Sequence, residues 1–181
     1  MEPPIERILF TESQIDARIR EVAAAVSAQY AGRELKLIGV LKGSIFFLTA
    51  LARHITVPVR IDLLGISTFG KSAPGVVRIA KDLDDPIEAE DVLLVEDIVD
   101  TGFTLRYLLQ TLASRGPNSL AVCTFLDRTS RRIVQVPIDF RCFEIPDRFV
   151  IGFGLDYNQL YRNLNYVAVM ARDLELPRSS S

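Results

Sequence analysis

Three carboxylates stand close together in the segment VLLVEDIVDTGFTL, residues 92–105, which contains no lysine or arginine. Val92 to Val95 is an apolar run typical of a buried strand, Glu96 and Asp97 follow it directly, and Asp100 comes three residues later. Neighbouring carboxylates can accept hydrogen bonds from the vicinal hydroxyls of a ribose or can hold a hydrated Mg²⁺. We therefore expect a diol and a metal ion, rather than protein cations, as the partners of these acids. The alternative is that Glu96 and Asp97 are ordinary polar residues at a strand end.

The turn from Thr101 to Thr104 leads from this strand into a helix. Leucines at helical spacing follow the turn, and Gly116-Pro117 predicts the end of that helix. The free N–H groups at the start of a helix and its positive dipole end suit a phosphate. Small residues at Thr101 and Gly102 would let the backbone approach the anion, and the Thr101 and Thr104 hydroxyls could donate to it. A phosphate beside two diol-binding acids predicts a ribose 5-phosphate site.

The turn after Asp100 matches neither of two common nucleotide-binding motifs. The turn is not GxxxxGK[ST], which argues against a P-loop nucleotidase, and it is not GxGxxG, which argues against a dinucleotide-binding fold.

The elements that must position these residues alternate between strands and helices. A capping box at 11–14 predicts the first helix, and a second helix is expected over 43–55. Strands are expected over 35–41, 57–66, 76–83, 91–97, 119–126, 148–154 and 166–171, with a mobile loop over 67–75. This alternation indicates an α/β fold with a mostly parallel sheet covered on both faces. Ligands in such folds bind at the carboxyl ends of strands, where the acids lie.

Length and composition restrict the class of protein. The 181 residues suit one domain, 1–181, with a core over about 8–170 and a disordered tail at 177–181. Hydrophobic residues make up 49%, too many for a disordered chain, and the net charge of −2 gives no basic footprint for nucleic acid. The N-terminus lacks the pattern of a signal peptide, and no apolar run is long enough to span a membrane. We expect a soluble cytoplasmic protein, with Cys123 and Cys142 as reduced core thiols.

The segment 92–105 resembles the phosphoribosyl-pyrophosphate signature of the type I phosphoribosyltransferases. The stretches LKGSIFF (41–47), KDLDDPI (81–87) and FEIPDRFVIGFGLDYNQLYRNL (143–164) resemble the hypoxanthine-guanine branch of that family, and the resemblance covers residues 8–170. It implies a mostly parallel central sheet flanked by helices, with a small hood from the chain ends and the C-terminal segment. The implied reaction transfers ribose 5-phosphate from phosphoribosyl pyrophosphate to N9 of hypoxanthine or guanine, with Mg²⁺, in a homodimer or homotetramer.

The resemblance also implies roles for individual residues. Asp100 is the expected general base, and the Leu41–Lys42 peptide is expected in the cis form. The residues expected to bind phosphoribosyl pyrophosphate are Leu41, Lys42, Gly43, Glu96, Asp97, Asp100, Thr101, Gly102, Phe103, Thr104 and Arg162. Those expected at the purine are Ile98, Arg128, Phe149, Val150 and Asp156, and those expected to hold Mg²⁺ are Glu96, Asp97 and Asp156.

Two positions depart from the family pattern. Thr68-Phe69 stands where the lid loop of the family has Ser-Tyr, and Arg128 stands where the family has the lysine that donates to the purine 6-oxo group. The change at Arg128 leaves a xanthine-preferring enzyme as one alternative, and a non-catalytic regulator that binds phosphoribosyl pyrophosphate or RNA is another. Nearby, Arg131-Arg132 is expected to be a solvated face.

Overall fold

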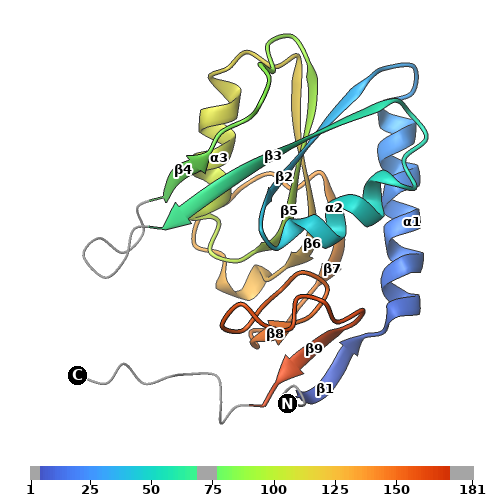
Figure 1. The fold of residues 1–181 in the computed structure, drawn as a ribbon, viewed down its shortest axis with the longest axis vertical. Coiled ribbons are helices and arrows are strands. Elements are labelled where there is room, and N and C mark those ends of the chain that lie inside the picture. The colour runs from blue at the N-terminus through green and yellow to red at the C-terminus, as the bar shows by residue number, and fades with distance from the viewer. Residues whose placement is uncertain (1–4, 69–76, 172–181) are drawn as a thin grey trace.

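The computed structural model describes residues 5–68 and 77–171. Within them, the chain builds one large sheet, one small sheet and three α-helices (Figure 1). No helix among these residues is long and apolar enough to cross a bilayer. The expected tail at 177–181 and the lid residue Phe69 lie outside the described residues.

The large sheet has the strand order β4-β3-β2-β5-β6-β7. Every neighbouring pair is parallel except β3 and β4, which are antiparallel. The strands are β2 (Leu35–Leu41), β3 (Val59–Thr68), β4 (Val77–Lys81), β5 (Asp91–Val99), β6 (Ser119–Asp127) and β7 (Phe140–Glu144). The expected mostly parallel sheet is therefore confirmed.

Helices cover both faces of this sheet (Figure 1). Helices α1 (Glu12–Gln29) and α2 (Ser44–Ala52) pack on one face, and α3 (Phe103–Ala113) packs on the other. Because side chains alternate along a strand, β2 sends Leu35 and Leu37 into the core under α1 and α2, and Ile38 and Val40 into the core under α3. Helix α1 begins with the predicted capping box at Thr11.

The small sheet joins both ends of the described chain. Strand β1 (Ile5–Phe10) pairs antiparallel with β9 (Val167–Met170), and β9 pairs antiparallel with β8 (Val150–Ile151). The β1 and β9 strands lie side by side at the bottom of Figure 1. This sheet is the hood that the family resemblance implied.

Several element boundaries differ from the prediction. The strand expected over 148–154 is only two residues long, because Gly152, Phe153 and Gly154 all have positive φ angles that turn the backbone. Helix α2 is shorter at both ends than the expected 43–55. Cys123 and Cys142 are free and buried, as expected.

Candidate active site

A cavity of about 310 Å³ opens between the carboxyl ends of β2 and β5. These two strands are neighbours, yet the helices that follow them, α2 and α3, leave toward opposite faces of the sheet. Such a reversal creates a crevice at the strand ends, which is where open α/β sheets bind ligands. Residues 40–43, residues 96–102 and the distant Asp156 and Arg162 all line the cavity.

Close backbone packing joins the end of β2 to the acids of β5. The Leu41–Lys42 peptide is cis, as the resemblance implied, and Gly43, the next residue, is the N-cap of α2. A Cβ atom on Gly43 would overlap the Asp97 carboxylate, and one on Gly154 would overlap the Gly43 carbonyl. The two glycines therefore let the β2 loop, Asp97 and the 154–162 segment touch one another.

Glu96 is buried and its neighbour Asp97 is partly buried, and both stand apart from the ion pairs of the described residues. Glu96 is 5% exposed, and neither side chain has an ion pair among the described residues. Burial raises the pKa of Glu96 well above its usual range, and the neighbouring charge of Asp97 raises it further. Burial also raises the pKa of Asp97 to about 6, against the opposing effects of its backbone hydrogen bonds and Arg162. The ionised form of Glu96 thus has no compensating group, and the groups near Asp97 compensate its charge only in part.

Asp100 differs from this pair, and here the expectation of acids without protein cations was wrong. Its Oδ2 lies 3.3 Å from Arg128 Nη1, and its Oδ1 lies 3.5 Å from Arg131 Nε. Both arginines follow β6, far from Asp100 in the chain, so the local sequence could not reveal them.

The turn after Asp100 lies along the same cavity. Thr101, Gly102 and Thr104 line it, while the Phe103 side chain is 49% exposed and does not. Gly102 has φ +92, and a Cβ atom there would overlap the carbonyl of Val134. Gly102 therefore needs to lack a side chain so that the turn can contact the 128–134 segment. The same lack of a side chain would let an anion approach the backbone.

A second cavity of about 220 Å³ adjoins the first. The two share Asp97, Ile98, Asp100 and Asp156 in their walls. Only the second is lined by Arg128, Phe149, Val150 and Leu155. The structure thus brings the expected purine residues together, next to the expected phosphoribosyl residues.

Known proteins are similar to this chain in sequence and in fold. The family model of the phosphoribosyl transferase domain matches residues 9–158. The chain belongs to the phosphoribosyl transferase family. It is 42% identical to a hypoxanthine-guanine phosphoribosyltransferase of Streptococcus agalactiae, over 96% of this chain and 98% of that protein. It is 45% identical to a hypoxanthine phosphoribosyltransferase of Salmonella typhimurium, over 88% of this chain and 92% of that protein. The crystal structure of a hypoxanthine phosphoribosyltransferase from Staphylococcus aureus superimposes with a TM-score of 0.91 at 38% identity, over 96% and 95% of the two chains.

In this phosphoribosyl transferase, the C-terminal segment holds its charged residues through a small network. Arg162 Nη2 lies 2.7 Å from Asp156 Oδ1, and Arg162 Nη1 donates to the Gly154 carbonyl at 2.7 Å. Gln159 donates its backbone N–H to Asp156, and its amide oxygen accepts from Lys42 Nζ at 3.4 Å. Gln159 was not predicted as a site residue, although the stretch 143–164 that carried the resemblance contains it.

The second residue missed by the sequence analysis is Arg132. Its side chain is only 9% exposed and forms an ion pair with Asp127, so the expected solvated face was wrong for Arg132. Arg131, at 49% exposed, fits that expectation. Nothing in the local sequence separates the two arginines, because the difference arises from the path of the chain after β6.

The acids fit a Mg²⁺ that takes most of its ligands from a substrate. No group of three or more acidic, histidine or cysteine side chains converges into a cation site within residues 5–68 and 77–171. Magnesium is commonly held by one or two carboxylates together with substrate phosphates and water. The buried Glu96 and Asp97, which lack a protein cation, match such a donor set.

Proposed function

We propose that the chain transfers ribose 5-phosphate from phosphoribosyl pyrophosphate to N9 of hypoxanthine or guanine, giving IMP or GMP and pyrophosphate. The observation that carries the proposal is the junction of the two cavities. Asp97, Ile98, Asp100 and Asp156 form walls of both, so a ribose in one cavity and a base in the other would meet there. The identity to hypoxanthine-guanine enzymes supports the choice of base.

In the first cavity, Glu96 and Asp97 accept hydrogen bonds from the ribose hydroxyls. The backbone of residues 101–104 and the Thr101 and Thr104 hydroxyls hold the 5-phosphate at the start of α3. The Leu41–Gly43 loop and Arg162 face the pyrophosphate, to which Lys42 and Arg162 bring fixed positive charge. These contacts orient the ribose for attack by the base.

In the second cavity, Arg128 and Asp100 recognise the purine. Arg128 Nε is a buried donor and Asp100 Oδ1 a buried acceptor, and neither has a hydrogen-bond partner among the described residues. A 6-oxopurine offers the complementary pair, an oxygen at C6 and a ring N–H. Phe149, which is 37% exposed and touches Tyr157 edge-on, stacks on the base, and the Val150 backbone contacts its edge.

The reaction forms the bond from N9 to ribose C1 and breaks the bond from C1 to pyrophosphate. Asp100 accepts the proton that the purine loses. Lys42 and Arg162 stabilise the negative charge that builds up on the departing pyrophosphate. Mg²⁺, when held by Glu96 and Asp97 with support from Asp156, would supply further charge neutralisation.

Rates of nucleotide formation with hypoxanthine, guanine, xanthine and adenine test the proposal. Adenine presents a 6-amino donor to the Arg128 donor, so we expect it to be rejected by roughly 10³-fold or more. Xanthine should react weakly, and hypoxanthine and guanine should react best. Equal use of adenine, or a clear preference for xanthine, would overturn the assignment of the base. Absence of product with all four bases would favour a non-catalytic binding protein.

The wider setting is also a proposal. We place the chain in the cytoplasm, a compartment that suits its two free, buried cysteines. We infer a homodimer or homotetramer, because the family resemblance implies one. Light scattering on the purified protein reports the oligomeric state.

A further inference from the structure

The segment after β6, residues 128–134, donates hydrogen bonds to the carbonyl groups of the turn after β5, residues 99–101. Arg128 N–H donates to the Val99 carbonyl at 2.9 Å. The N–H groups of Ile133 and Val134 both donate to the Thr101 carbonyl, at 3.0 and 2.9 Å. The Asp100 carbonyl between them accepts from the Arg132 side chain, through Nε at 2.9 Å. Each carbonyl from Val99 to Thr101 is thus fixed by this one segment.

Fixing these carbonyls also fixes the N–H groups on the other side of each peptide. In a trans peptide the N–H of the next residue points opposite to the carbonyl, and the peptides of this turn are trans. The N–H groups of Asp100, Thr101 and Gly102 therefore point away from the 128–134 segment. None of them has an acceptor among the described residues, and all three residues line the first cavity. Successive free N–H groups of this kind form an anion site.

Among these hydrogen bonds to the carbonyls of residues 99–101, Arg132 donates from its side chain and the other donors are backbone N–H groups. The Arg132 guanidinium is itself held in place. It lies 9% exposed and forms an ion pair with Asp127, whose side chain is 4% exposed. The second oxygen of Asp127 accepts from Arg141 Nη1 at 2.9 Å. Arg132 Nη2 also reaches the Val99 carbonyl at 3.4 Å. The planar fork of an arginine can serve the carboxylate and two carbonyls at once, which a lysine ammonium at the end of a flexible chain does less well.

We propose that Arg132, held by Asp127, is a positioning residue for the phosphate-binding turn. It directs the N–H groups of residues 100–102 into the cavity and so sets the affinity for the 5-phosphate of the substrate and of the nucleotide product. This role rests on the proposed function, because it takes that phosphate as the ligand of the turn. Arg132 itself does not line either cavity.

The test compares IMP with inosine, which differ only in the phosphate. In Arg132→Lys, which keeps the charge beside Asp127, the affinity for IMP should fall about tenfold, the effect of a lost charge-assisted hydrogen bond. The affinity for inosine should stay within about twofold, since the purine cavity is unchanged. The KM for phosphoribosyl pyrophosphate should rise by the same factor as the Kd of IMP, while the KM for hypoxanthine stays constant.

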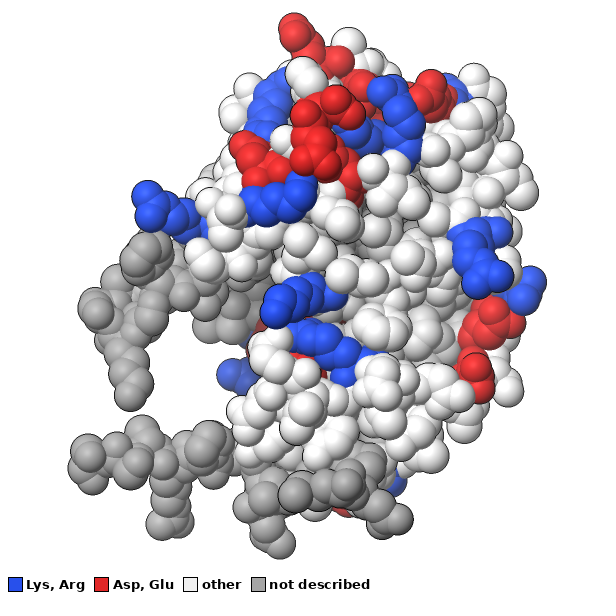
Figure 2. All heavy atoms as spheres, in the orientation of Figure 1, with Lys and Arg blue, Asp and Glu red and all other residues white. Residues whose placement is uncertain are grey.

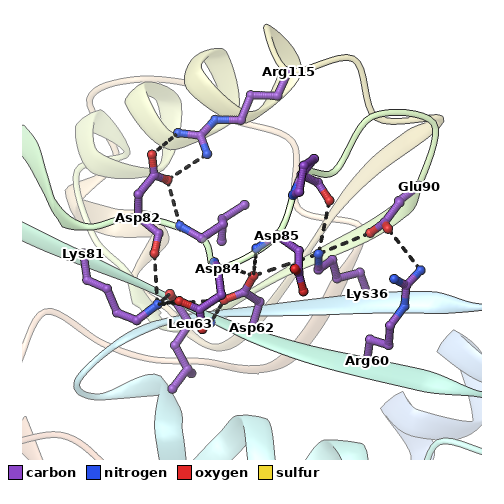
Figure 3. Close-up of polar contacts among 12 residues, drawn as sticks. Lys36, Arg60, Asp62, Leu63, Lys81, Asp82, Asp84, Asp85, Glu90 and Arg115 are labelled. Atoms are coloured by element: carbon purple, nitrogen blue, oxygen red, sulfur yellow. Dashed lines mark hydrogen bonds and ion pairs between the residues drawn. The ribbon is translucent and has the colours of Figure 1, made fainter.

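A matched control is Arg115→Lys. Arg115 also pairs with an aspartate, Asp82, at 2.7 and 3.0 Å (Figure 3). It lies between the end of α3 and the start of β6, so it is at the end of the sheet opposite the cavity. This variant should change neither the affinity for IMP nor the affinity for inosine.

The outcomes separate this inference from the proposed function. If Arg132→Lys binds IMP as tightly as wild type, or loses IMP and inosine affinity equally, the positioning role is wrong. If the wild type binds no IMP and forms no nucleotide, the proposed function itself fails. Should Arg132→Lys not fold, Asp127→Asn is the second variant. It removes the charge and one of the two acceptor oxygens that hold Arg132 and Arg141, so it should weaken IMP binding selectively by a smaller factor. Unchanged selectivity for IMP in that variant also rejects the role.

Discussion

Two buried carboxylates of the same sheet, Glu96 and Asp62, have opposite surroundings. Both are 5% exposed. Asp62 lies 3.9 Å from both Lys36 Nζ and Lys81 Nζ, and it accepts the backbone N–H groups of Leu63 and Asp84 at 2.7 and 3.1 Å (Figure 3). Glu96 has no such partner among the described residues. The protein compensates the first charge itself and leaves the second to a ligand.

The two acids also belong to different ends of the sheet. The network around Asp62 includes Lys36 at the start of β2 and Glu90 just before β5, and Glu90 pairs with Lys36 and Arg60. Figure 2 shows acidic and basic side chains interspersed at the top of that view. Glu96 belongs to the carboxyl end, where the cavities lie. Burial alone therefore does not show that an acid is functional. Asp62, which has protein cations beside it, stabilises the fold, whereas Glu96, which has none among the described residues, indicates a binding site.

The largest effect is expected for Asp100→Asn, at the carboxyl end of the sheet where the cavities lie, here called the ligand end. Turnover should fall roughly 10²–10⁴-fold, because the amide cannot act as a general base. The free energy of unfolding should change by less than about 1 kcal/mol, since the partly exposed Asp100 contributes little stability through its arginine pairs. Binding of phosphoribosyl pyrophosphate should stay nearly intact. Steady-state rates, urea unfolding and the Kd of phosphoribosyl pyrophosphate measure the three quantities. Normal turnover in this variant removes Asp100 from the role of base.

Lys36→Met should show the reverse pattern. The side chain of Lys36 is 2% exposed, and its loss leaves Asp62 and Glu90 with less compensation. We expect a loss of about 3–5 kcal/mol in the free energy of unfolding. The folded variant should keep its KM for phosphoribosyl pyrophosphate.

The matched control for Lys36→Met is Lys42→Met. Lys42 is an exposed lysine of the ligand end. Its replacement should lower activity and leave stability within about 0.5 kcal/mol of wild type. If both lysine variants lost stability alike, the contrast between the two ends of the sheet would be unfounded.

Arg128 sharpens the comparison, because it gives one acid of the ligand end a protein cation. Arg128→Ala should lower kcat/KM for hypoxanthine and guanine. The loss should correspond to about 2–3 kcal/mol of transition-state stabilisation, the scale of a lost charge-assisted hydrogen bond. Arg128→Lys should retain both activities, and neither change should alter the Kd of phosphoribosyl pyrophosphate. An alanine variant that uses hypoxanthine as well as wild type shows that Arg128 does not read the base.

The smallest effect is a difference in how stability depends on pH. Burial raises the pKa of Asp97 from 3.8 to about 6, so its contribution to stability is complete below pH 3.8 and is lost as the pH rises toward 6. Pairing with Arg115 lowers the pKa of Asp82, so its contribution is present above pH 3.8 and is lost as the pH falls through the lowered pKa.

Urea unfolding from pH 3.5 to 7 in a metal-chelating buffer measures both slopes. Wild type should lose stability relative to Asp97→Asn between about pH 4 and 6. Arg115→Met should be less stable than wild type at neutral pH and should approach it in acid, by a small amount because Asp82 is 55% exposed. Parallel profiles for all three proteins would contradict the opposite pKa shifts.

The fold followed from patterns that are local in the sequence, whereas the partners of the site residues did not. Consecutive residues form the apolar runs of β2, β5 and β6 and the capping box of α1, so these elements can be recognised locally. By contrast, the pairing of Asp100 with Arg128 and the burial of Arg132 depend on how the chain continues after β6, 28 and more residues away. A strand was predicted at β8, but its length of two residues was not, because positive φ angles at Gly152 and Gly154 override an apolar pattern.

The pairing of β1 with β9 has a consequence for synthesis of the protein on the ribosome. Ile5 can find its partner Met170 only after almost the whole described chain has emerged. The six-stranded sheet and the phosphate-binding turn need nothing beyond Glu144 for their strands, so they can form while β8 and β9 are still being made. A nascent chain would therefore acquire the phosphate-binding end of the site first. The wall of the purine cavity at Val150, which pairs with Val169, would be completed last.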